Sequence, residues 1–284
     1  MKEAEGNADA EALYAYFQES EAAEVFRQHG FRVLDETVAS DASRRYPAAK
    51  QRPTFFLLSS AEWVALRLSF QVAVCAALAG LPIALAVAYL LARASFPGKW
   101  VLEAVVNAPL VLPPVVTGYL LLILLAPRGP IGSVLGDVFG VKIVFTWWAA
   151  VVASAVVSFP LMVRAIRLAF EAIDPRLEMA ARSLGASRLA TFFSVTLPLA
   201  RRGVIAGWML AFARSLGEFG ATIMVAGNIE GYTNTIPLQI YSMSSEPGGM
   251  GQCWRLVVLS IILACGALAV SELLARRQNR HESA

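Results

Sequence analysis

The stretch DPRLEMAARSLGASRLATFFSVTLPLARR, residues 174–202, is a charged segment set between two long apolar runs. Asp174 can cap a helix N-terminus, and Pro175 suits the first position of the helix that follows. Gly185 is expected to end this helix, because glycine tolerates the left-handed conformation found just past a helix end. The first half of the stretch therefore predicts one short helix between Asp174 and Gly185.

The second half of the stretch predicts another short helix. Ser187 can cap it, and we expect it to run through Phe193 and to stop at Leu197-Pro198, because proline lacks a backbone donor.

The first helix is predicted to be amphipathic, because its apolar residues recur at three- and four-residue steps and form one apolar face. These residues are Leu177, Ala180, Ala181 and Leu184. Together the two helices predict a compact knob, with an ordinary amphipathic loop as the alternative.

The composition around this stretch is that of a membrane protein. Hydrophobic residues make up 57% of the 284 residues and charged residues 16%, whereas a soluble domain carries roughly a quarter charged residues. We therefore predict an all-α, polytopic membrane protein. The net charge of +3 is too small to indicate a nucleic-acid partner. The three cysteines and two histidines match no disulfide or metal spacing, so the sequence predicts no cofactor.

Five apolar runs predict five transmembrane helices, because about 20 residues cross the hydrocarbon core as a helix. Twelve Lys and Arg residues, Arg93 among them, lie in or beside residues 94–102, 169–198 and the C-terminus, against five on the opposite side. Such an excess is typical of cytoplasmic loops. This predicts that the 174–198 loop and the tail 278–284 are cytoplasmic and that the N-terminus lies outside. The runs are about 63–92, 103–126, 143–168, 199–226 and 255–275.

The polar N-terminal part is predicted to lie apart from the membrane domain, residues 57–277. Residues 1–35 carry an amphipathic helical pattern that Gly30 ends, followed by a short extended piece, FRVL. They lack the apolar stretch of a secretory signal. Residues 36–56 read as a polar linker. The segment between the fourth and fifth apolar runs, residues 227–251, is turn-rich. It is predicted to be extracytoplasmic, with one short helix at 236–243.

Two charged residues lie inside the fourth apolar run. Arg214 and Glu218 are four residues apart, so they can pair on one helix face. Gly217 and Gly220 flank Glu218, which lets another backbone approach closely or the helix bend. Ionisable groups at membrane depth are costly when unpaired, and they face the protein interior or a water-filled cavity. The pair predicts either a gate on a translocation path or a structural ion pair at a subunit or dimer interface.

Prolines interrupt the second apolar run. Pro113 and Pro114 follow Pro109, and each proline removes a backbone donor and bends the helix. Backbone groups freed in this way are tolerated in a membrane only where they are buried or face water. Thr117 follows about one turn later. The pattern predicts a kinked, pore-lining helix with a constriction, or a simple packing distortion.

Enzyme activity is not indicated. The sequence has no GxxxxGK[ST] phosphate-binding motif, so the chain is not expected to hydrolyse ATP itself. It also lacks a recognisable nucleophile and base arrangement. A secondary transporter or channel is the alternative from another class, but paired inverted repeats or more intramembrane carboxylates would then be expected.

The 174–198 loop resembles the signature loop of ABC-importer permeases. That loop reads Glu-Ala-Ala, three residues, Gly, nine residues, an aliphatic residue, one residue and Leu-Pro. Met179 stands at the position of the family's Glu, and Glu178 lies one position earlier. The residues in register are Ala180-Ala181, Gly185, Val195 and Leu197-Pro198.

Two further stretches, SLGEFGAT at 215–222 and PLVLPPVVTGYLLL at 109–122, make residues 57–277 similar to the molybdate type of these permeases. The resemblance implies the membrane subunit of an ATP-driven importer in the cell inner membrane, with molybdate as substrate or, alternatively, tungstate, sulfate or thiosulfate. It also implies a homodimer, separate ATP-binding subunits and a periplasmic binding protein, for which residues 227–251 are a candidate contact. Residues 1–35 resemble the C-terminal end of such a binding protein, as a remnant or a clipped fusion, with a nonspecific amphipathic tail as the alternative.

The resemblance places candidate site residues in two groups. The first group would contact the ATP-binding subunit and comprises Asp174, Glu178, Ala180, Ala181, Leu184, Gly185, Leu197 and Pro198. The second group would line or gate the translocation path and comprises Pro113, Pro114, Thr117, Arg214 and Glu218.

Overall fold

The computed structural model describes residues 58–245 and 250–280 of the chain. All secondary structure elements within these residues are helices, which confirms the all-α prediction. Predictions for residues 1–35 and 36–56, and for the last four residues of the tail, lie outside the described residues. The helices are α4 (Ser60–Arg93), α5 (Lys99–Val111), α6 (Pro114–Leu125), α7 (Pro130–Phe139), α8 (Trp147–Glu171), α9 (Pro175–Ser183), α10 (Arg188–Thr191), the π-helical turn η1 (Phe192–Thr196), α11 (Leu197–Leu216), α12 (Gly220–Ala226), α13 (Ile236–Ser245) and α14 (Met250–Arg280).

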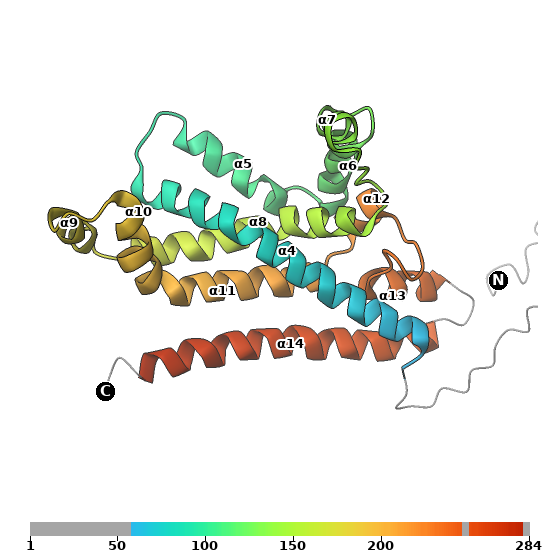
Figure 1. Ribbon diagram of the computed structural model, residues 1–284. Helices are drawn as coiled ribbons and strands as arrows, with labels where there is room; N and C mark the ends of the chain where they lie inside the picture. The colour runs from blue at the N-terminus through green and yellow to red at the C-terminus, as the bar shows by residue number, and fades with distance from the viewer. Residues whose placement is uncertain (1–57, 246–249, 281–284) are drawn as a thin grey trace, which may run out of the picture. The chain divides into compact units, whose positions relative to one another are not determined.

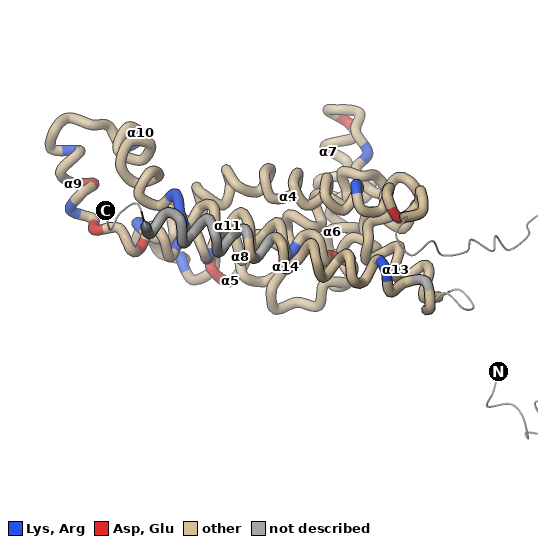
Figure 2. The backbone as a smooth tube through the Cα atoms, turned by 90° about the horizontal axis from the view of Figure 1, so that it is seen from below, with Lys and Arg blue, Asp and Glu red and all other residues tan. Residues whose placement is uncertain are grey.

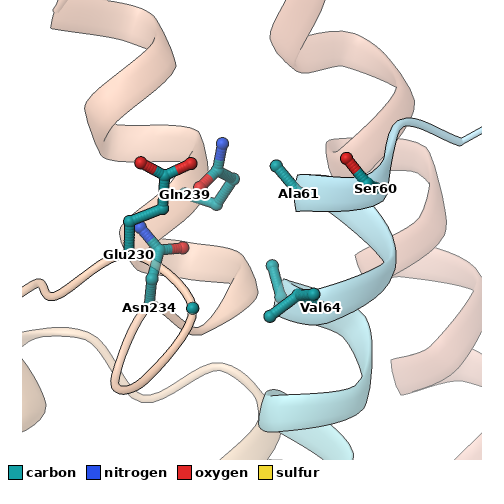
Figure 3. Close-up of a pocket in the computed structure, with 8 residues that line it drawn as sticks. Ser60, Ala61, Val64, Glu230, Asn234 and Gln239 are labelled. Carbon is teal, nitrogen blue, oxygen red and sulfur yellow. The ribbon is translucent and has the colours of Figure 1, made fainter.

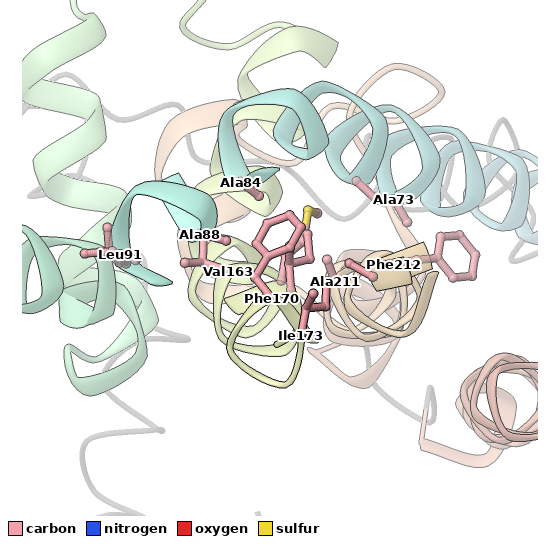
Figure 4. Packing of buried hydrophobic residues seen from close by; sticks show 14 of the residues in the cluster. Ala73, Ala84, Ala88, Leu91, Val163, Phe170, Ile173, Ala211 and Phe212 are labelled. Carbon is pink, nitrogen blue, oxygen red and sulfur yellow. The ribbon is translucent and has the colours of Figure 1, made fainter. Parts of the chain in front are cut away.

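Helices α4, α8 and α11 pack on one another and form the centre of the membrane domain (Figure 1). Alanines of α4 are fully buried here, and small side chains let membrane helices approach closely. Phe170 of α8 and Phe212 of α11 belong to the same cluster (Figure 4). The buried alanines of α4 in this cluster are Ala73, Ala77, Ala84 and Ala88.

The start of α4 is fixed by two interactions of Glu62. Its carboxylate accepts a hydrogen bond from the Ser59 backbone at 2.6 Å, and the Ser59 hydroxyl accepts one from the Glu62 backbone at 3.2 Å, which forms a capping box. The same buried carboxylate lies 3.1 Å from the Arg255 guanidinium. Helix α14 is thereby joined to the first turn of α4.

Three helices in the described residues are long and apolar enough to cross a membrane. They are Ser60–Arg93, Trp147–Glu171 and the continuous helix Arg188–Leu216. Helices α5 and α6 meet at a bend of 116°. If the two helices together are counted as one broken span, the number of candidate spans rises to four. Within α14, the apolar stretch Cys253–Gly266 is shorter than the length needed to cross a membrane. The prediction of five spans therefore stays a prediction.

Two of the predicted apolar runs are broken in the structure. The run 103–126 divides between Val111 and Pro114, because the two consecutive prolines restart the helix in a new direction. The run 199–226 divides at Gly217, where α11 ends, and α12 begins at Gly220. The bend between α5 and α6 agrees with the kink predicted from the prolines, and the break after α11 lies at the glycines that flank Glu218.

The short helices gather at the two ends of the central helices. Helices α9 and α10 lie at one end, and α12 and α13 lie at the other (Figure 1). Helix α13 begins at Ile236, which confirms the short helix predicted at 236–243. Charged residues also gather toward these two ends (Figure 2). The candidate residues of the two groups therefore lie far from one another.

Candidate functional site

The local chemistry of the 174–198 loop follows the sequence prediction up to residue 191. The Asp174 carboxylate accepts a hydrogen bond from the Arg176 backbone at 2.9 Å and caps α9. Gly185 follows the end of α9 with φ +93°, the left-handed conformation expected of it. The Ser187 hydroxyl then accepts a hydrogen bond from the Ala190 backbone at 3.2 Å and caps α10. Both predicted caps and the glycine break are confirmed.

The predicted stop at Leu197-Pro198 was wrong. The chain continues through the π-helical turn Phe192–Thr196 into α11, and Pro198 lies in the first turn of that helix. In the π-helical turn the Leu197 backbone donates to the Phe192 carbonyl, five residues back. A wider turn at this point accommodates a proline that lacks a donor, so the helix is not broken.

The apolar face of the loop is turned outward. None of the α9 residues is buried, and the Leu184 side chain is 90% exposed. Apolar side chains gathered on an exposed surface are typical of a site that binds another protein. The large exposed apolar residues of the loop are Leu177, Met179, Leu184, Leu189 and Phe193.

Glu178 differs from its neighbours because its side chain is turned toward the body of the protein. Its carboxylate lies 3.1 Å from the Arg93 guanidinium at the end of α4 and accepts a hydrogen bond from the Thr196 hydroxyl at 3.0 Å. Arg93 also donates to the Ile173 carbonyl at 2.9 Å. We call these residues, Arg93, Glu178 and Thr196, the α9 tether. Glu178 is predicted to contact the ATP-binding subunit; within this chain its carboxylate contacts Arg93 and Thr196, and the docking role stays a prediction.

A hollow of about 760 Å³ lies between the end of α4 and helices α9 and α10. Arg93 and Glu178 line it together with apolar side chains that include Tyr89 and Phe192. Arg182 and Arg188 belong to the same lining. The tether thus crosses a space that is otherwise open, so α9 is held to α4 by polar contacts rather than by a packed apolar core.

The candidate path residues lie where two broken helices meet. Pro113 is the N-cap of α6 and Pro114 its first residue, after the 116° bend from α5. Glu218 occupies the break between α11 and α12. Thr117, in the first turn of α6, is buried. The structure therefore places all of these residues at breaks or directly beside them.

Glu218 has two roles at its break. Its side chain is 1% exposed and lies 2.8 Å from the Arg214 guanidinium, which is 30% exposed. Its other carboxylate oxygen accepts a hydrogen bond from the Ala221 backbone at 2.9 Å and so caps α12. The predicted pairing of Arg214 with Glu218 is present. The single helix face predicted for it is not, because α11 ends at Leu216 before Glu218 is reached.

The break between α5 and α6 and the break between α11 and α12 are in contact at glycine residues. A Cβ atom on Gly118 of α6 would lie 2.7 Å from the Cα atom of Ala221 in α12, which is closer than real Cβ atoms come. A Cβ atom on Gly220 would lie 2.9 Å from the Cβ atom of Pro114. Only glycine permits this approach of the two backbones. We call the contact between residues 113–118 and 218–222 the helix-break crossing.

Sequence reasoning missed the partners that organise both regions. Arg93 was read only as a topology signal at the end of an apolar run, and nothing local connects it to a residue 85 positions away. The glycines that flank Glu218 indicated a close backbone approach, but nothing local identified Gly118 of α6 as the partner. A glycine one residue after Thr117 in a helical pattern was a second signal of such an approach.

Comparison with known proteins agrees with this architecture. Residues 80–280 match the family described as binding-protein-dependent transport system inner membrane component. The alginate importer of a bacterium, a solved ABC transporter structure, matches 94% of this chain and 95% of its own chain with a TM-score of 0.62 at 14% identity, which shows a shared fold. The chain belongs to the family of membrane components of binding-protein-dependent transport systems, and it is a transport subunit.

Two relatives with different transport functions match this chain to different extents. The molybdenum transport system permease protein ModB of Escherichia coli (strain K12) is 54% identical over 220 residues, which cover 78% of this chain and 96% of that protein. The sulfate transport system permease protein CysT of Salmonella typhimurium is 41% identical over 162 residues, which cover 57% of this chain and 58% of that protein. The chain is thus similar to the molybdenum permease over a larger part of both proteins.

Proposed function

We propose that this chain is the membrane subunit of an ATP-driven importer of molybdate in the cell inner membrane. The observation that carries the proposal is the 54% identity to a molybdenum permease over almost that protein's whole length. Tungstate is the nearest alternative substrate, because it is also a tetrahedral dianion. Sulfate and thiosulfate are less favoured, since the sulfate permease is matched over a shorter part of its length.

Two copies of the chain would form the pore, with two ATP-binding subunits on the cytoplasmic side and a periplasmic binding protein on the other. In this topology the chain has five spans, an outside N-terminus and a cytoplasmic C-terminus. The gathering of Arg residues around the 174–198 loop supports a cytoplasmic position for that loop. Residues 1–35 would be a remnant of a binding protein, and we expect a chain without residues 1–56 to transport at an unchanged rate.

The 174–198 loop would be the docking site for the ATP-binding subunit. Its exposed Leu184 and Leu189 supply apolar surface, and the alanines at 180 and 181 leave room for a partner to approach. Gly185 has no atom within 4 Å of the place where a Cβ would stand, so a larger side chain there points into the docking surface. Asp174, Leu197 and Pro198 would set the two ends of the loop.

The α9 tether would carry the motion of the ATP-binding subunits into the membrane. When these subunits close on ATP, they would push α9, and Glu178 would transfer the displacement to Arg93 on α4 and to Thr196 at the start of α11. Both helices belong to the central packing of the membrane domain. A small movement at α9 therefore has a direct route to the helices around the path.

The helix-break crossing would line or gate the translocation path. Broken helices at membrane depth are tolerated only where the freed backbone groups are buried in protein or face a water-filled cavity. Arg214 is 30% exposed beside a buried carboxylate, so its guanidinium can meet a passing dianion. If Arg214→Ala leaves both molybdate uptake and its coupling to ATP intact, the crossing is structural and the path assignment is wrong.

Reconstitution in proteoliposomes with the binding protein and the ATP-binding subunit tests the proposal. We expect uptake of labelled molybdate that requires ATP, and stimulation of ATP hydrolysis by molybdate and tungstate more than by sulfate. Gly185→Glu should insert into the membrane normally but uncouple hydrolysis from uptake, with Gly136→Ala as a control on another exposed helix. Uptake that proceeds without ATP would indicate a secondary transporter or channel and refute the proposal.

A further inference from the structure

At the end of the molecule opposite the 174–198 loop, a hollow of about 190 Å³ lies between the first turns of α4 and the segment before α13 (Figure 3). Helix α4 contributes an apolar wall, and the segment and the first turn of α13 contribute polar side chains. The wall consists of Ala61, Val64 and Ala65, and the polar side consists of Glu230, Asn234 and Gln239. We call this hollow the Glu230 socket.

Both sides of the socket are held in place. The Asn234 amide donates to the Asn228 side chain at 2.7 Å, and Asn228 donates to the Ser242 hydroxyl of α13 at 2.6 Å. The Thr233 hydroxyl accepts a hydrogen bond from the Ile229 backbone at 2.9 Å and closes the turn that carries Glu230. On the other side, the capping box at Ser59 and Glu62 fixes the first turn of α4. The socket is therefore formed before any partner arrives.

One atom of the socket lacks a partner. Asn234 is 5% exposed, and its side-chain oxygen accepts no hydrogen bond from the described part of the chain. Figure 3 shows this oxygen on the side that faces α4, while the amide nitrogen points away. Buried polar atoms are nearly always hydrogen-bonded, so an unmatched acceptor at the edge of a hollow indicates a missing donor.

The socket chemistry selects a basic side chain. Glu230 is exposed and supplies a carboxylate, and Asn234 supplies a neutral oxygen, so both offer acceptors to the hollow. Lysine and arginine combine an apolar stem with a head that only donates. The stem can lie along Val64 and Ala61 while the head pairs with the exposed Glu230 carboxylate and is directed toward the Asn234 oxygen. An oxyanion is excluded from the same place, because Glu230 repels it.

We propose that the Glu230 socket receives a lysine or arginine side chain of the soluble binding protein. This inference rests on the proposed function, which places α13 and the segment before it on the outer side of the membrane. Ile229 and Tyr232, which flank Glu230, are exposed, and apolar and aromatic side chains around a charged contact are typical of a protein interface. The socket would orient the loaded binding protein over the pore.

Binding of the purified, molybdate-loaded binding protein to the importer in nanodiscs tests the inference. Glu230→Gln should raise the Kd about tenfold, because a charge-assisted hydrogen bond is lost. It should also flatten the salt dependence of the association rate, since the attraction of Glu230 for the basic side chain is removed. Asp137→Asn, the same charge change on exposed α7, should alter neither. An unchanged Kd for Glu230→Gln would overturn the inference.

A charge exchange identifies the donor. Glu230→Lys should abolish binding, and one Lys→Glu or Arg→Glu substitution on the binding protein should restore it, whereas the same substitution should weaken binding to the unmodified importer. If no substitution restores binding, the contact assigned here is wrong. Proper folding of each variant is checked by its elution from a sizing column and by its basal ATP hydrolysis with the ATP-binding subunit.

The chain's own N-terminal part offers a rival donor, because Lys50 and Arg52 precede Ser60 by only a few residues. If removal of residues 1–52 abolishes the effect of Glu230→Gln, the socket holds this segment and the inference is wrong. Failure of the proposed function is separable: the unmodified importer would then show no ATP-driven molybdate uptake. Uptake by the unmodified importer together with an unchanged Kd for Glu230→Gln refutes the socket alone.

Discussion

The helix-break crossing and the 174–198 loop use the same residue types in opposite ways. Both regions contain proline, glycine and a glutamate that forms an ion pair with an arginine. At the crossing, Glu218 is 1% exposed, and a Cβ on Gly118 would collide with α12. At the loop, Leu184 is 90% exposed, and Gly185 has nothing within 4 Å of a Cβ position. The crossing is completed by the chain itself, whereas the loop leaves its apolar surface for another protein.

This difference separates stability from coupling. Substitutions at the crossing should lower the free energy of unfolding, because they disturb contacts that the folded chain already makes. Substitutions at the loop should leave the fold intact and act on the ATP-binding subunit. Variants of the two regions can therefore be compared with one another. A loop variant that lowers stability, or a crossing variant that weakens binding of the ATP-binding subunit, would contradict the distinction.

The largest loss of stability is expected for Glu218→Ala. The change leaves Arg214 without its partner and removes the cap of α12, and breaking a buried ion pair costs about 3–5 kcal/mol. We expect a loss of about 3 kcal/mol, the lower end of this range, because Arg214 keeps contact with solvent. The measurement is the thermal unfolding midpoint in detergent.

A matched control for this prediction is Glu103→Ala. Glu103 lies 2.8 Å from Arg167, but these side chains are 34% and 29% exposed. Such a pair contributes only about 0–1 kcal/mol. Equal losses for the two variants would show that burial at the crossing does not govern its stability.

The largest effect on coupling is expected for Leu184→Glu. A charge on this exposed side chain should leave the unfolding midpoint unchanged but weaken binding of the ATP-binding subunit by about 30-fold, the cost of a central contact of about 2 kcal/mol. Co-purification and ATP-driven uptake report the loss. Leu184→Met, which keeps the apolar surface, is the control. A variant that binds its partner normally would remove the loop from the docking surface.

Gly118→Ala and Gly185→Ala compare the two regions with the same added methyl group. At Gly118 the methyl group meets the Ala221 backbone, and such overpacking costs about 1–3 kcal/mol. At Gly185 there is space, and only the positive φ adds a cost, of about 1 kcal/mol. The unfolding midpoint should therefore fall further for Gly118→Ala. The reverse order would mean that α6 and α12 are not in backbone contact.

Sequence reasoning succeeded where the cause of the structure is local. Asp174, Gly185 and Ser187 act on backbone groups within a few residues, so their caps and turn could be predicted. The pairing of Arg214 with Glu218 was predicted from a spacing of four. The exposure of the loop's apolar face could be expected only from the family resemblance, because the same periodicity also describes a buried helix.

Sequence reasoning failed where distant segments decide the structure. Pro198 was read as a stop, but the chain passes into α11 through the π-helical turn Phe192–Thr196, whose Thr196 hydroxyl donates to Glu178, 18 residues earlier. The glycines beside Glu218 allowed a bend, but the apolar run continues through them, and only the cap that Glu218 provides for α12 shows that a new helix starts there. Neither event leaves a periodic signal in the residues around it.

Only a small loss of stability is expected for variants of the α9 tether, which joins the loop to α4 and α11. Arg93→Ala should cost about 1 kcal/mol at most, because Glu178 keeps the Thr196 hydroxyl as a donor and lies in an open hollow. Glu178→Gln should cost a similar amount. In the double variant the two costs should not add, since both remove one interaction.

The tether nevertheless predicts a separate effect on transport. If α9 passes its displacement to α4 and α11 through Glu178, Arg93→Ala should lower the molybdate carried per ATP hydrolysed while the ATP-binding subunit still binds with unchanged affinity. Leu184→Glu lowers that affinity instead. The ratio of molybdate transported to ATP hydrolysed therefore distinguishes a loss of docking from a loss of coupling through the α9 tether. An Arg93→Ala importer with a normal ratio would show that α9 moves the membrane helices through the backbone around Ile173 rather than through this ion pair.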